Sequence, residues 1–193
     1  MIAWADVLLG KAWQALPLGI LLATSGFFSG AETALFSLSR GEVHRLRSQS
    51  GAGRMVAALL DEPRRLMNLL LFANMLVNVA FSAICAVGAL EMRHAGAPHL
   101  VVGGISLAPL LLLILFGEIV PKALALSVGR RWALFTAPIL TVITPVLRPV
   151  MWIFEAGLVF PLMRLVAPAT RLMPEITSEE LDALLQLSAK RGV

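Results

Sequence analysis

The fold of this chain depends on a short segment in its most apolar part, LFGEIVPK at residues 115–122. An ionisable group such as Glu118 is costly inside a membrane span and marks a functional site by default. In an α-helix Pro121 has no N–H for the carbonyl four residues earlier, so we expect the Gly117 carbonyl to be free. Hard cations such as Mg²⁺ and Ca²⁺ bind carbonyl and carboxylate oxygens of this kind. The alternative is a proline kink in which Glu118 pairs with Lys122 one turn further on.

The composition around this segment predicts an all-α integral membrane protein. Of the 193 residues, 58% are hydrophobic and only 15% are charged, whereas a soluble domain has about 25% charged residues. Six arginines fall between Arg40 and Arg65, which is typical of a cytoplasmic flank and gives no reason to expect a nucleic-acid partner. The single cysteine, Cys85, cannot form an intrachain disulfide.

Three apolar runs predict membrane spans at about residues 7–38, 66–90 and 100–128, because about 20 apolar residues cross the hydrocarbon core. The basic stretch at residues 41–65 has apolar residues at helical spacing and is expected to form one or two amphipathic surface helices. Together with the segment that follows the third span, these elements make up the expected transmembrane domain, residues 1–169.

The last part of the expected domain, residues 132–169, carries five prolines, at 138, 145, 149, 161 and 168. Because a proline breaks or kinks a helix, we expect a broken juxtamembrane helix pair or a re-entrant hairpin there. Residues 170–193 turn polar and offer a helix cap followed by acidic residues. They are expected to begin a linker helix in the cytoplasm.

The distribution of arginine predicts the orientation in the membrane. The 40–65 segment and the Arg130-Arg131 pair are rich in arginine, whereas the loop at residues 91–99 has one. By the positive-inside rule the N-terminus is expected outside and the C-terminus in the cytoplasm. The predicted location is the inner (plasma) membrane, with several spans and the lipid bilayer as the immediate partner.

The few polar residues within the spans are predicted to lie in one layer. They come from all three spans: Ser25, Ser29 and Glu32, then Asn74 and Asn78, then Gly117 and Glu118. Apart from Glu32, each lies 9 to 15 residues from the nearest flanking arginine, or roughly 14–22 Å along a helix. This is near the middle of a hydrocarbon core of about 30 Å. Alternatively, the serines could bond back to their own helix and the asparagines could only join helices.

The chemistry of this layer favours a hard cation. Its ligands are hydroxyl, amide, carbonyl and carboxylate oxygens, without sulfur or histidine, which suits Mg²⁺, Ca²⁺ or Na⁺ better than zinc or copper. Donor chemistry alone does not separate these three ions.

Three motifs in this chain resemble signatures of the CNNM/CorC membrane domain. They are SGFFSGAETALFSLSR at residues 25–40, NMLVN at residues 74–78 and GEIVPK at residues 117–122. The tail EITSEEL at residues 175–181 resembles the segment that leads to a cytoplasmic pair of CBS domains. The resemblance covers nearly the whole chain.

The resemblance implies three transmembrane helices and a juxtamembrane helix pair, assembled as a homodimer. It also implies Mg²⁺ export coupled to Na⁺ entry, and a CBS pair in the full-length protein that binds ATP. By similarity, the metal-site candidates are Ser25, Ser29, Asn74, Asn78, Gly117 and Glu118. No catalytic residue or resident cofactor is expected.

Two other functions compete with transport. One is an intramembrane enzyme with Glu118 as general acid or base, although no serine–histidine pair, aspartate pair or zinc motif supports it, and we expect no enzyme. The other is a membrane anchor for a cytoplasmic sensor, in which the polar layer serves helix packing only.

Overall fold

The computed structural model describes residues 12–49, 51–154, 156–157 and 161–162, and its regular elements in these ranges are all helices. Three helical stretches are long and apolar enough to cross a membrane: Ala15–Phe36, Pro63–His94 and His99–Phe154. The all-α membrane fold with three candidate spans is thus confirmed. The chain divides into two compact units, residues 1–151 and 152–193, and the elements below belong to the first unless stated.

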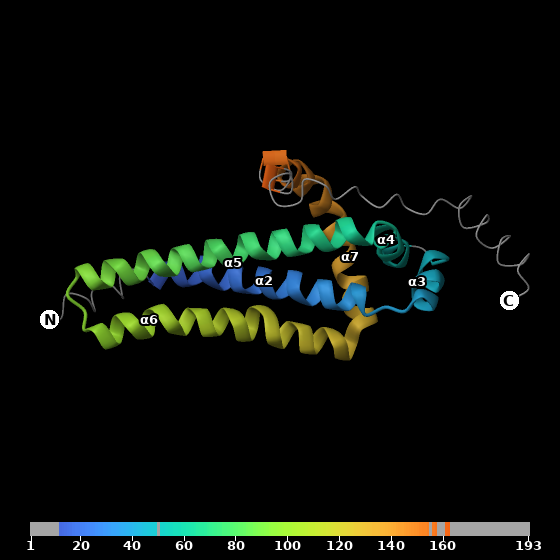
Figure 1. Cartoon of the computed structure of the whole chain (residues 1–193). Helices are drawn as coiled ribbons and strands as arrows, with labels where there is room; N and C mark the ends of the chain where they lie inside the picture. The colour runs from blue at the N-terminus through green and yellow to red at the C-terminus, as the bar shows by residue number, and fades with distance from the viewer. Residues whose placement is uncertain (1–11, 50, 155, 158–160, 163–193) are drawn as a thin grey trace, which may run out of the picture. The chain divides into compact units, whose positions relative to one another are not determined.

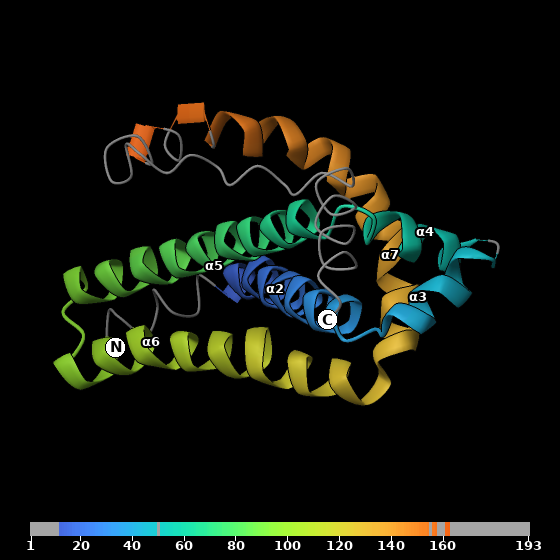
Figure 2. The ribbon, with the colours of Figure 1, turned by 45° about the vertical axis from the view of Figure 1, so that its right-hand side comes forward.

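The first unit is a bundle of long helices with two short helices at one end. After the 3₁₀ turn η1 (Ala12–Gln14), α2 (Ala15–Phe36) packs against α5 (Pro63–His94), and α5 also contacts α6 (His99–Leu112). Figures 1 and 2 show α2, α5 and α6 running side by side. The expected first span began at residue 7, and residues 7–11 lie outside the described part of the chain, as do the linker helix and most of residues 155–169.

Two short amphipathic helices connect α2 to α5, at the end of the bundle where α2 finishes (Figures 1 and 2). They are α3 (Arg40–Arg47) and α4 (Ala52–Leu59), which contact each other and bury Leu46 and Val56 in the common core. A capping box starts α3. There the Ser39 hydroxyl and backbone N–H donate to the Glu42 carboxylate and lower its pKa.

The third candidate span changes its helical register halfway. It begins as α6, continues as the π-helix η2 (Leu113–Ile119) and ends as α7 (Val120–Phe154), whose one residue with non-helical dihedral angles is Val128. The kink coincides with the end expected for this span. Pro138, Pro145 and Pro149 lie within α7, so the prediction that these three prolines would break the helix is wrong. Packing against neighbouring helices allows proline inside membrane helices.

The core of the first unit is built largely from small residues, which let the helix backbones approach closely. Ala31 and Ala34 of α2 are fully buried and share one cluster with Ala73 of α5 and with Ala125 and Ala133 of α7. By contrast, large apolar side chains on the outside of the bundle are widely exposed, which is appropriate for a surface in contact with lipid.

Candidate cation site

The hydroxyl of Ser25 lies at the centre of a cluster of oxygen atoms from three helical segments. Its Oγ is 2.7 Å from Asn78 Oδ1, 3.1 Å from Asn74 Oδ1 and 3.4 Å from the carbonyl oxygen of Gly117. Ser25 is completely buried. Residues predicted from three separate motifs therefore meet at the Ser25 hydroxyl.

The local sequence explains why these atoms converge. Asn74 and Asn78 are four residues apart in α5, so their side chains lie on one face of the helix. Gly117 has no side chain, and a Cβ there would lie 2.9 Å from Ser25 Oγ. Only glycine at this position lets η2 approach α2 closely enough to bring its carbonyl to the serine.

The Ser25 hydroxyl is surrounded by more acceptor oxygens than it has protons to donate. A serine hydroxyl carries a single proton, but three acceptor oxygens surround Ser25 Oγ within 3.4 Å. The amide group of Asn78 does not supply the missing donor, because its Nδ2 donates instead to Glu118 Oε1 at 3.1 Å. A buried hydroxyl that faces more acceptor oxygens than it can serve is an environment that a cation would stabilise.

The Glu118 side chain is half-buried at the edge of this cluster. It brings a carboxylate within one hydrogen bond of the asparagine that contacts Ser25. Lys122 does not pair with Glu118, and its Nζ lies 3.6 Å from a carboxylate oxygen of Glu32 on α2. The alternative of a Glu118–Lys122 pair one turn apart is therefore wrong, and the charge of Glu118 remains available next to the oxygen cluster.

Ser29 occupies a separate position one turn further along α2. Its hydroxyl donates to the backbone carbonyl of Glu118 at 3.4 Å, and the side chain is buried. None of its recorded hydrogen bonds reaches Ser25 or the two asparagines. Five of the six candidates thus form one connected network, and Ser29 contacts that network through the backbone of Glu118.

The π-helix changes the role expected for Pro121. The N–H of Val120 bonds to the carbonyl of Leu115, five residues earlier. Continued by one residue into α7, this register would place the missing N–H of Pro121 opposite the carbonyl of Phe116, whereas the α-helical count of four residues places it opposite Gly117. The Phe116 carbonyl instead lies 3.1 Å from the position that a Cβ would occupy on Gly26. The sequence gives no local signal for a π-helix, although such segments are frequent at functional sites.

An open groove leads to the asparagines and Glu118 from one side of the first unit. Its volume is about 790 Å³. Polar residues of its lining are Asn74, Asn78, Ser82 and Glu118, and apolar ones include Met75 and Val79. Ser82 lies four residues after Asn78 in α5, on the same helix face as the asparagines, and the groove extends the polar cluster to it. The arrangement offers an ion both a buried set of oxygens and a route to it.

Residues 18–193 match the family described as the cyclin M transmembrane N-terminal domain. The chain belongs to this family. A UPF0053 protein of Haemophilus influenzae is 32% identical over 171 residues, which cover 86% of this chain and 39% of that protein. The UPF0053 inner membrane protein YfjD of Escherichia coli is 26% identical over 167 residues, 85% of this chain and 38% of YfjD.

A further relative of this cyclin M domain is a UPF0053 protein of Synechocystis, 30% identical over 178 residues that cover 90% of this chain and 48% of that protein. The chain therefore spans less than half the length of these relatives. The family and the inner-membrane relative identify a membrane protein of the cyclin M class, in agreement with the three apolar helical stretches.

Proposed function

We propose that this cyclin M domain transports Mg²⁺ across the membrane through the oxygen cluster around Ser25. The observation that carries the proposal is the shortage of protons: three acceptor oxygens surround one hydroxyl within 3.4 Å. Mg²⁺ binds to oxygen at about 2.0–2.1 Å and keeps several of its water molecules. A few fixed oxygens are therefore enough to replace part of the hydration shell.

Each residue has a distinct part in this proposal. Ser25, Asn74, Asn78 and the Gly117 carbonyl supply neutral oxygens, and Glu118 supplies negative charge that offsets the loss of water around the ion. Ser29 holds the backbone of Glu118 in place through its hydrogen bond. Na⁺ suits the same ligands, so both ions can use one site in turn. Export and coupling to Na⁺ entry rest on the family resemblance.

Transport also needs a change of access, and η2 is the element best suited to it. A π-helix holds one residue more per turn than the α-helices on either side of it. A return of Leu113–Ile119 to the α register would rotate Gly117 and Glu118 away from Ser25. We infer that such a shift opens the site and releases the ion.

Flux measurements on the purified full chain in liposomes test this proposal. With a Mg²⁺ indicator inside the vesicles, we expect flux that an opposing Na⁺ gradient stimulates. Ser25→Ala should reduce this flux roughly tenfold or more, because removal even of a group that only orients a metal ligand costs about 10- to 100-fold. Ser106→Ala is the matched control, because its hydroxyl donates only to Val102 of its own helix at 2.9 Å.

The outcomes separate transport from the anchor function. Equal flux in wild type, Ser25→Ala and protein-free vesicles would contradict transport by this domain. Binding of Mg²⁺ without flux would leave a metal-sensing anchor as the better description.

A further inference from the structure

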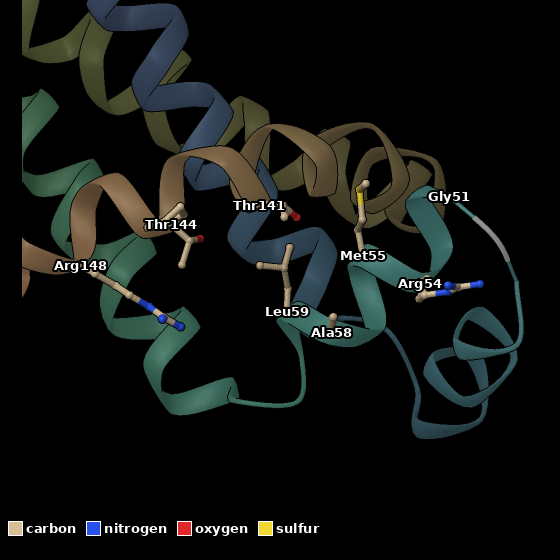
Figure 3. A pocket seen from close by; sticks show the side chains of 9 residues that line it. Gly51, Arg54, Met55, Ala58, Leu59, Thr141, Thr144 and Arg148 are labelled. Atoms are coloured by element: carbon tan, nitrogen blue, oxygen red, sulfur yellow. The ribbon is translucent and has the colours of Figure 1, made fainter.

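A second pocket lies between α4 and α7 and shares no lining residue with the groove beside the cation site (Figure 3). Its volume is about 620 Å³, and Met55, Ala58 and Leu59 of α4 supply apolar parts of its wall. The hydroxyls of Thr141 and Thr144, on the α7 side, donate to carbonyls one turn earlier in their own helix. Apart from its arginines, the side chains of this wall offer mainly an apolar surface.

Two arginines make this apolar pocket positively charged. Figure 3 shows Arg148 on the α7 side and Arg54 on the α4 side, with Leu59 between them. Neither forms an ion pair with any described residue, whereas the nearby Arg47 and Arg65 are paired with Asp61 and Glu62. Asp61 and Glu62 are therefore already neutralised by other arginines. Within the described part of the chain, no acidic side chain neutralises the positive charge of Arg54 and Arg148.

The start of α4 adds to the preference for an anion. Gly51, which lines the pocket, precedes the helix with φ 67°, and no side chain caps the first N–H groups of α4. Uncapped N–H groups and the helix dipole both favour negative charge at a helix start. Arg54 lies in this same first turn and lines the pocket, so both features belong to the α4 side of the pocket.

Exposed apolar surface continues from the pocket along α7. Val142 and Val146 are 69% and 67% exposed. Val142 lies three residues before Pro145 of the pocket wall, and residues at this spacing are neighbours on a helix surface. Together these features suit a ligand with an anionic head and an apolar tail. A free phosphate ion could pair with the two arginines, but it has no apolar part to contact Val142 and Val146.

We propose that this pocket binds an anionic glycerophospholipid, with phosphate oxygens paired to Arg54 and Arg148 and an acyl chain along Val142 and Val146. Basic pockets between membrane helices are suited to such head groups. A lipid with two phosphates, such as cardiolipin, can engage both arginines at once. It should therefore bind more tightly than phosphatidylglycerol, and phosphatidylcholine should bind least.

Lipid titration of the purified full chain in detergent tests the site. The readouts are bound lipid in native mass spectra and the rise in Tm with cardiolipin, phosphatidylglycerol, phosphatidylcholine or inorganic phosphate. We expect the double variant Arg54→Gln/Arg148→Gln to bind the anionic lipids roughly thirtyfold more weakly. Arg64→Gln is the control, because it removes an exposed arginine from the same end of the bundle without touching the pocket.

Three results would overturn the proposal. They are equal binding of cardiolipin by wild type and the double variant, equal binding of phosphatidylcholine and the anionic lipids, and a Tm rise with inorganic phosphate as large as that with lipid. The last would identify a site for free anions. Arg54→Lys/Arg148→Lys keeps the positive charge. If this variant still binds the lipid, the loss of binding in the glutamine variant is due to the lost charge and not to a damaged fold.

Discussion

Asn78 joins the two halves of the polar cluster at the scale of single residues. Its Oδ1 lies 2.7 Å from Ser25 Oγ, and its Nδ2 lies 3.1 Å from Glu118 Oε1. The amide thus connects the neutral oxygens to the one carboxylate of the network. Under the proposed function, loss of this side chain removes an ion ligand and the group that orients Glu118.

We therefore predict that Asn78→Ala lowers Mg²⁺ affinity at least tenfold while the protein still folds. A bound ion present at 100 times its Kd stabilises the folded state by about 2.7 kcal/mol, and a tenfold weaker ion at the same concentration by about 1.4 kcal/mol, so about half of the effect or more should be lost. Thermal unfolding with and without Mg²⁺ measures the difference. Asn68→Ala is the control, since Asn68 is an exposed asparagine of the same helix. An unchanged Mg²⁺ effect in Asn78→Ala, Asn74→Ala and Ser25→Ala alike would rule out the site.

Gly117 offers a test of the packing that brings the site together. In Gly117→Ala the new Cβ would lie 2.9 Å from Ser25 Oγ and 3.2 Å from Leu113 Cδ1. Overpacking of this kind costs about 1–3 kcal/mol, so we expect a lower Tm and weaker Mg²⁺ binding. Gly103→Ala should do neither, because nothing lies within 4 Å of its Cβ position. Wild-type stability and affinity in Gly117→Ala would contradict the close approach of η2 and α2.

At the scale of elements, the central feature is the π register of η2. The N–H of Val120 already bonds five residues back, to Leu115. In Pro121→Ala the restored N–H would therefore reach the Phe116 carbonyl, and the Gly117 carbonyl would keep its place beside Ser25.

Pro121→Ala should then bind Mg²⁺ within about twofold of wild type, but transport more slowly, because an extra backbone hydrogen bond holds η2 in one register. Calorimetric titration and liposome flux give the two readouts. A tenfold loss of affinity in a folded variant would instead indicate that the new N–H bonds to Gly117, as in a continuous α-helix.

The sequence predicted some elements of this fold well, for identifiable reasons. The four-residue step from Asn74 to Asn78 and the depth of Gly117 depend only on helix geometry, and the structure brings both to Ser25. The pairing of Lys122 with Glu32 joins two helices far apart in the chain, and spacing within one helix could not reveal it.

The π register and the continuation of α7 through Pro138, Pro145 and Pro149 were not predictable for the same reason. The Phe116 carbonyl and the Pro121 ring both lie 3.1 Å from the Cβ position of Gly26, so contact between helices accompanies the change of register. In α7, the buried Ala137 and Leu140 flank Pro138. Tertiary packing there outweighs the local tendency of proline to end a helix.

At the scale of the whole molecule, the arginine asymmetry predicts that the end carrying α3 and α4 faces the cytoplasm. Cysteines at Ser48 and at His94, each in a Cys85→Ala background, can be treated with an impermeant thiol reagent in intact cells. We expect labelling at position 94 and none at position 48. The reverse pattern would invert the topology.

Assembly is a second property of the whole molecule. The groove beside Asn78 and Glu118 is open on one side, and a carboxylate that faces lipid is costly. We therefore predict a two-fold homodimer in the membrane, as the family resemblance also implies. Mass measurement in mild detergent over a range of concentrations should give twice the chain mass. A monomer at every concentration would contradict this prediction.

The most direct test of a Mg²⁺ site is an experimental structure of the full chain at saturating Mg²⁺. The proposal predicts an ion about 2.0–2.1 Å from Asn78 Oδ1 and from the Gly117 carbonyl oxygen, with Ser25 Oγ in the same coordination shell and water at the remaining positions. A structure of the transport-active protein that places Mg²⁺ elsewhere in the membrane domain, with Ser25 and the asparagines still bonded only to one another, would contradict it.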